Sequence, residues 1–221
     1  MKYRGFTRQS GFTLVEIAIV LVIIGLLLGG VLKGQELINS AKVKSLGSEM
    51  KAVQTAYYTY QDKFRAIPGD DVLATTHLGA TVNGVTIVNP AASNGQINTG
   101  TWVGVATAPT AANESALFWQ HVRAAGLISG NAAIGEAVNA VGGKLGITNL
   151  AQFPAGGLTG KVICTGNLDG TMAAQLDTML DDGVGNTGSV QVKAGLNLTT
   201  ATVAATAAPA AGTIYSVCMS F

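Results

Sequence analysis

Residues 11–32 read GFTLVEIAIVLVIIGLLLGGVL, and this stretch decides how the chain is organised. From Phe12 to Leu32 the only strongly polar side chain is Glu16. At about 1.5 Å per residue, a helix over these positions is roughly 30 Å long, which matches the hydrocarbon thickness of a bilayer. The sequence therefore predicts a membrane-spanning helix near the N-terminus.

The eleven residues before this stretch, MKYRGFTRQSG, are basic. They contain Lys2, Arg4 and Arg8 and no acidic residue, although the whole chain has a net charge of only +1. Positive flanks stay on the cytoplasmic side, so we expect the residues after about position 35 to be exported. A cleaved secretory signal peptide is the alternative, but the apolar run is long, contains a carboxylate and is not followed by an A-x-A-like site.

The composition as a whole is apolar, with 48% hydrophobic and only 11% charged residues. Such a chain is too apolar to be intrinsically disordered and too poor in charge for an ordinary cytosolic enzyme. An apolar segment must therefore be hidden in lipid or against another subunit.

The junction GFTLVE at 11–16, followed by an uninterrupted apolar helix, resembles the class III signal of type IV prepilins and of the pseudopilins of type II secretion. The resemblance implies that a membrane-embedded prepilin peptidase cuts after Gly11 and methylates the new amino terminus at Phe12. The family's glutamate at the fifth mature position falls on Glu16. The implied parts are a leader (1–11), a stem helix (12–66, of which 12–34 serve the membrane and assembly and 35–66 are amphipathic) and a globular head (67–221).

Glu16 is an acidic residue inside an apolar segment. An ionised carboxylate in hydrocarbon is costly unless it is paired, and after residues 1–11 are removed no Lys or Arg lies within two helical turns of it. We therefore expect its partner to come from elsewhere, namely the amine of Phe12 on a neighbouring subunit, so that the charge sets the register between helices. The alternative is a membrane-edge glutamate that reaches the headgroups.

Four glycines interrupt the apolar helix at two small-residue spacings, Gly25-x-x-x-Gly29 and Gly30-x-x-x-Gly34. Each glycine in a helix costs ~1 kcal/mol relative to alanine, so this concentration requires a reason. Either helices approach one another closely here, or the helix is built to loosen during assembly. The sequence supports both interpretations equally.

Beyond the membrane segment, apolar residues recur at alternating steps of three and four, with charged residues between them. This spacing predicts an amphipathic helix continuous with the apolar one. It should end near Ala66, because Pro68 disfavours helical geometry in the residue before it. The apolar positions are Val43, Leu46, Met50, Val53, Tyr57, Tyr60 and Phe64.

The remaining residues predict an α+β fold, and the resemblance implies that it is pilin-like, with the long N-terminal helix packed on a small antiparallel β-sheet head with one disulfide. A helix is expected at 115–125, capped by Asn113, and another at 171–180 with Met172, Leu176 and Met179 facing inward. Strands bounded by Asn, Gly and Pro are expected at 82–88, 102–106, 161–165, 189–194 and 213–219.

Cys164 and Cys218 are the only cysteines of the chain. In an exported head we expect them to form one disulfide. On the chain-entropy model, closing a loop of about 55 residues stabilises the fold by roughly 4 kcal/mol. The alternative of a reactive thiol pair lacks the C-x-x-C spacing of redox motifs.

Little in the head suggests catalysis or cofactor binding. His77 and His121 are the only histidines, and no nucleophile elbow is present. After residue 64 there are five Lys or Arg against eight Asp or Glu, which disfavours nucleic-acid binding. The sequence predicts neither an enzyme nor a bound cofactor.

One group of acidic residues is a candidate for metal binding. Asp177, Asp181 and Asp182, together with Asn186, carry oxygen atoms of the kind that bind calcium. Their spacing is not that of an EF-hand loop, so the sequence favours a solvated helix end over a calcium site.

Two functions of different classes are consistent with these features. The first is a structural subunit, a pilin or pseudopilin, that resides in the inner membrane with its head exported and then joins a homo-oligomeric filament in the periplasm or outside the cell. For that subunit the resemblance implies the membrane, the prepilin peptidase and an inner-membrane assembly platform as partners. The second is a membrane-anchored binding or enzymatic module, for which the helix is only a tether.

Overall fold

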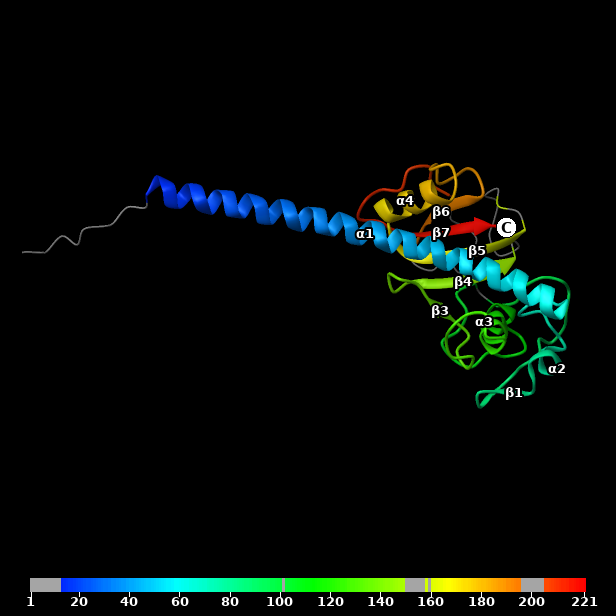
Figure 1. The fold of residues 1–221 in the computed structure, drawn as a ribbon. Helices are drawn as coiled ribbons and strands as arrows, with labels where there is room; N and C mark the ends of the chain where they lie inside the picture. The colour runs from blue at the N-terminus through cyan, green and yellow to red at the C-terminus, as the bar shows by residue number, and fades with distance from the viewer. Residues whose placement is uncertain (1–12, 101, 150–157, 159, 196–204) are drawn as a thin grey trace, which may run out of the picture. The chain divides into compact units, whose positions relative to one another are not determined.

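The computed structural model describes residues 13–100, 102–149, 158, 160–195 and 205–221. Its contacts divide the chain into two compact units, one ending at Ala41 and one spanning Lys42–Phe221. Helix α1 (Leu14–Phe64) supplies residues to both units, and the described strands all belong to the second (Figure 1). The predicted α+β fold is confirmed.

The first unit contains α1 as far as Ala41, and no face of this helix is covered by the residues that the structure describes there. Large apolar side chains such as Leu14, Leu21 and Leu26 are 91%, 64% and 73% exposed. The helix is long and apolar enough to cross a membrane. Because ordinary surface helices bury their apolar stripe, this surface requires lipid or other protein chains to cover it.

In the second unit, α1 is buried along one stripe, as the periodicity predicts. The helix ends at Phe64, because Arg65 adopts a left-handed backbone conformation with φ of 55°. This end lies two residues before the predicted one at Ala66. The fully buried apolar positions of the stripe are Val43, Leu46, Met50, Val53, Tyr57 and Tyr60.

A five-stranded antiparallel sheet forms the centre of the second unit, in the order β3-β4-β5-β7-β6. Ile163 and Val217 face a core that they share with α1, whereas Val162 and Cys218 face a smaller core on the other side. Figure 1 shows the cyan end of α1 lying across this sheet. The strands are β3 (Ala137–Val138), β4 (Lys144–Asn149), β5 (Lys161–Asp169), β6 (Val190–Ala194) and β7 (Ile214–Ser220).

Three shorter helices are described in the second unit in addition to α1. The Asn113 side chain caps α3, as predicted, and Asp169 caps α4 in the same way. Helix α4 packs on α1 at Gly47, where an added Cβ would displace the flexible end of the Met179 side chain. These helices are α2 (Ala74–Leu78), α3 (Glu114–Ala124) and α4 (Gly170–Leu180).

Two of the predicted strands are wrong. Residues 102–106 form no strand, and the backbone there makes only an isolated bridge between Val105 and Gly135. Residues 82–88 do not form one strand, because the chain turns at Asn83, which has a φ of 50°. The turn produces a short separate hairpin of β1 (Thr81–Val82) and β2 (Val85–Thr86).

The inward face of α4 also differs from the prediction. Met179 is 41% exposed and Met172 is only partly buried, so they do not form the inner face with Leu176. Ala173 and Asp177 lie in the interior instead. A charged residue therefore occupies a position that the apolar periodicity had assigned to the helix surface.

The predicted disulfide between Cys164 and Cys218 is present. The two cysteines lie directly opposite one another on the neighbouring strands β5 and β7. They pack with Trp102 and Leu158 in the smaller core. Because backbone hydrogen bonds already pair these strands, the disulfide fixes their register in addition to closing a long loop.

Replacing Cys164 with Ser should loosen the C-terminal part of the head and leave α1 folded, because a constraint worth up to about 4 kcal/mol is lost. Limited proteolysis of the full chain in detergent, with mass spectrometry of the fragments, should reveal new cuts between 164 and 218. The double variant Cys164→Ala/Cys218→Ala removes the disulfide without introducing a buried serine hydroxyl at position 164 or leaving a free thiol at Cys218. Equal resistance of wild type and double variant would contradict this role.

Candidate functional site

The N-terminal end of α1 is held by reciprocal hydrogen bonds between Thr13 and Glu16. The Glu16 N–H donates to Thr13 Oγ1 at 3.3 Å, while the Thr13 N–H and Oγ1 donate to Glu16 Oε2 at 2.8 and 2.7 Å. This arrangement is a capping box. The predicted cleavage site between Gly11 and Phe12, and the predicted methylation of Phe12, lie outside the described residues.

The capping box gives Glu16 neutral hydrogen-bond partners within the chain, in addition to the charged partner that the sequence predicts on a neighbouring subunit. The sequence signal for it is a Thr three residues before a Glu at the start of an apolar run. The donors are neutral, however, and the ion pairs formed by the described residues do not include Glu16. Glu16 is therefore hydrogen-bonded within the chain, but its negative charge is not balanced there.

The four glycines of the apolar helix face open space. A Cβ added at Gly25, Gly29, Gly30 or Gly34 would meet no described atom within 4 Å. No close contact within the described chain therefore requires these glycines. The two roles considered for them are close approach to helices of other copies and loosening of the helix during assembly.

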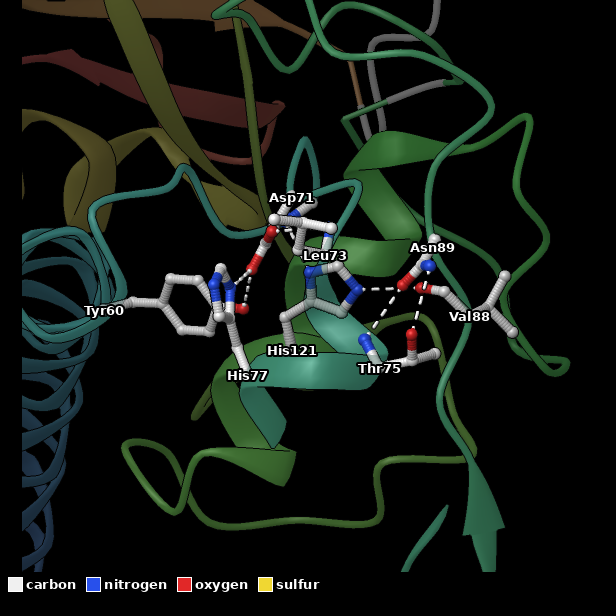
Figure 2. Close-up of polar contacts among 9 residues, drawn as sticks. Tyr60, Asp71, Leu73, Thr75, His77, Val88, Asn89 and His121 are labelled. Atoms are coloured by element: carbon white, nitrogen blue, oxygen red, sulfur yellow. Dashed lines mark hydrogen bonds and ion pairs between the residues drawn. The ribbon is translucent and has the colours of Figure 1, made fainter. Parts of the chain in front are cut away.

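A polar cluster joins the C-terminal end of α1 to the turn that follows it (Figure 2). At its centre is Asp71, which is 2% exposed. Its Oδ2 accepts a hydrogen bond from the Tyr60 hydroxyl at 2.8 Å and lies 2.7 Å from Nδ1 of His77, and its Oδ1 accepts from the Leu73 N–H at 2.9 Å. Burial and the hydrogen bond to Asp71 raise the pKa of Tyr60.

His121 on α3 also contacts the segment that follows α1, and it connects this segment to Val88 (Figure 2). The Gly69 N–H donates to Nδ1 at 3.0 Å, so the proton is on Nε2, which donates to the Val88 carbonyl at 2.9 Å. Both ring nitrogens are therefore used in the neutral form. Burial lowers the pKa of His121.

The pair of Asp71 and His77 resembles the way an acidic residue orients a histidine base in nucleophilic enzymes. An open pocket of ≈ 470 Å³ lies beside His77 and Phe64. Ser93 also lines this pocket, but its hydroxyl donates to Asp70 at 3.0 Å, and no described hydroxyl donates to His77. The described contacts therefore fasten the turn and α2 to α1 and α3. They do not activate a nucleophile.

A third polar group lies at the C-terminal end of α4. Carboxylate oxygens of Asp177, Asp181 and Asp182 come within 4.8 Å of one another. Asp182 is exposed, but Asp177 is only 1% exposed, so the predicted solvated helix end is wrong for Asp177. Burial and the charges of Asp182 and Asp181 raise the pKa of Asp177 to about 6.

The head should lose stability in mild acid because of His121. The pKa of His121 in the folded protein lies below the ordinary value of 6.5, so the unfolded chain takes up the proton first as the pH falls. The stabilisation that His121 contributes is therefore complete above about pH 6.5 and decreases below it. Denaturant unfolding of the full chain in detergent at pH 7.5 and 5.0 measures the loss. His121→Gln, which cannot take up a proton, should lose less stability over this interval, and an equal loss would contradict the assignment.

Comparison with protein families finds a match at the N-terminus. A family model described as the prokaryotic N-terminal methylation motif matches residues 6–32, a range that includes the Gly11–Phe12 junction, the capping box and the start of the apolar helix. A search of curated proteins finds no match. The chain therefore carries the class III signal of type IV prepilin-like proteins.

Proposed function

We propose that the chain is a structural subunit, a pilin or pseudopilin, of a type IV pilus-like filament outside the cytoplasm. The observation that carries this proposal is a class III signal at the start of a helix whose apolar residues, up to Ala41, are not covered by any described residue. In the precursor, lipid covers that surface. In the filament, the equivalent helices of neighbouring copies cover it.

Maturation converts the membrane precursor into the assembling form. The prepilin peptidase removes residues 1–11 in the inner membrane and methylates the new amino terminus of Phe12. The subunit then stays anchored by α1, with its head exported, until an assembly platform in the same membrane draws it into the filament. The match at residues 6–32 supports this sequence of events.

Glu16 sets the register between subunits in this proposal. Its hydrogen bonds to Thr13 fix the position of the carboxylate at the start of the helix, but its charge has no described counterion. The amine of Phe12 on a neighbouring copy supplies the opposite charge when the helices are staggered. The glycines at 25, 29, 30 and 34 allow neighbouring helices to approach, because their faces are open.

The second candidate function is a tethered binding or enzymatic module on the exported side of the membrane. The pocket beside His77 is the feature that favours it, because it is lined by both apolar and polar side chains. In that case α1 is only an anchor, and neither cleavage nor methylation is required.

Intact mass spectrometry of the membrane-extracted chain separates the two functions. Co-expression with a prepilin peptidase should remove residues 1–11 and add one methyl group at Phe12. Gly11→Val should block both changes, because the peptidase requires a small residue at the cut, and the uncut chain should stay in the membrane. A Gly11→Val chain that runs at the mature size, or a wild-type chain that retains Met1, would contradict the filament proposal.

A pair of variants tests whether the charge of Glu16 or its cap is needed for assembly. Glu16→Gln keeps a side chain that suits a capping box and removes the charge, so membrane insertion and cleavage should continue while fibres are lost. Thr13→Val keeps the charge and removes the cap, so it should weaken the helix start by about 1 kcal/mol and leave most fibres intact.

Electron microscopy of sheared surface fibres, with each variant as the only copy in the cell, provides the measurement. Wild-type numbers of fibres from Glu16→Gln would remove the register role of the charge. If only Thr13→Val lost its fibres, assembly would depend on the capping hydrogen bonds of Glu16 and not on its charge.

A further inference from the structure

Two N–H groups of α3 are buried without an acceptor. Trp119 is 1% exposed, and its indole Nε1 has no hydrogen-bond partner among the described residues. Nε of Arg123, one helical turn further along, is buried and unpaired in the same way. Both groups can only donate, and a buried donor without an acceptor costs free energy. Because native proteins satisfy the large majority of their buried polar groups, the pair calls for an acceptor that the described residues do not supply.

The rest of the Arg123 side chain is held in place by the loop that follows α3. Nη1 donates to the carbonyls of Asn131 and Ile134, and Nη2 donates to the carbonyl of Glu136 at 2.7 Å. The guanidinium carbon lies 5.2 Å from the centre of the Trp119 ring. The two side chains are therefore neighbours, and their arrangement is fixed by packing and by these hydrogen bonds.

Arg123 carries a positive charge that no ion pair among the described residues balances. Glu136 is the acidic residue whose charge acts on it, but the Glu136 carboxylate is already paired with Nζ of Lys144. Burial lowers the pKa of Arg123, because the guanidinium is partly removed from water. Since a guanidinium stays protonated in proteins, the site favours an acceptor with a negative charge.

Both side chains line a cavity of ≈ 290 Å³ between α1, α3 and the β3 edge of the sheet. Its walls are mainly apolar and include Val53 from α1, Ile128 from the loop after α3 and Leu145 from β4. It shares no lining residue with the cavity beside His77. Apolar walls with a small number of polar groups are typical of a small-molecule site, and this volume suits a small ligand.

We infer that this cavity binds a small organic acid with one carboxylate and a short apolar chain. The carboxylate accepts hydrogen bonds from Trp119 and Arg123 and balances the charge of Arg123. The apolar chain contacts the walls supplied by α1, the loop after α3 and β4, and displaces water from them. Glu49 on α1 also lines the cavity, and its negative charge disfavours a second carboxylate on the ligand.

Thermal unfolding and calorimetric titration of the full chain in nonionic detergent test the site. The probe is 4-methylpentanoate, for which we expect a Kd of roughly 10⁻⁴–10⁻³ M and a melting temperature that rises with ligand concentration. The neutral amide 4-methylpentanamide has nearly the same shape. It should bind at least ~tenfold more weakly, because it cannot balance the charge of the guanidinium.

Two tryptophan variants form a matched pair. Trp119→Phe keeps an aromatic ring and removes the indole N–H, so it should weaken binding of 4-methylpentanoate at least ~threefold. Trp102 packs in the smaller core with Cys164 and Cys218 and does not line the cavity. Trp102→Phe should therefore bind the probe with wild-type affinity, even if its melting temperature is lower.

Glu49→Gln tests the charge of the cavity in the opposite direction. A glutamine can still accept the hydrogen bonds that Ser45 and Ala140 donate to Glu49. Because a negative charge is removed, the variant should bind 4-methylpentanoate more tightly than wild type. A partly unfolded chain cannot produce such a gain.

Three results would overturn the inference. They are a wild-type melting temperature that millimolar 4-methylpentanoate does not raise, equal affinity for the acid and its amide, and an affinity that Trp119→Phe and Glu49→Gln both leave unchanged. A cavity that holds only water gives the first result. These measurements concern the isolated chain, so their failure would leave the filament proposal unaffected.

Discussion

The apolar surface of α1 between Leu14 and Ala41 is the constraint on which the layout of the chain depends. It surrounds the helix on all sides, and none of the residues described in its unit, 13–41, covers it. Exposing such a surface to water costs about 25 cal/mol per Å², so it is stable only in lipid or against other protein chains. From Val43 onward the apolar residues occupy one stripe, and that stripe can be covered by the sheet and helices of the head. One continuous helix therefore serves two environments.

The hydrogen bonds at Thr13 and Glu16 show how a charged residue is placed at the start of such a helix. A helix begins with unpaired N–H groups, and in an apolar surrounding each of them requires an acceptor. Glu16 provides one while Thr13 provides another, so the acidic residue has a local structural role before any contact with a second copy. The charge itself remains available for an intermolecular partner, because neutral donors do not compensate it.

The three buried aspartates of the head illustrate the difference between a satisfied and an unsatisfied carboxylate. Asp70 accepts hydrogen bonds from the loop at 93–95, and Asp71 accepts from Tyr60 and the turn at 73. Asp177 has no such donor among the described residues. The first two therefore stabilise the turn after α1, whereas burial and neighbouring carboxylates raise the pKa of the third to about 6.

Features that depend on residues close together in the chain could be predicted from the sequence. The apolar run, the stripe of α1, the Asn113 cap and the strands around Cys164 and Cys218 follow from local spacing and residue type, and all are confirmed. The inward orientation of Asp177 became visible only in the folded head. Folding also brought His121 to Gly69, 52 residues away, and added β3 and β4 to the sheet. Such contacts form between elements that meet only when the chain folds, so no local pattern specifies them.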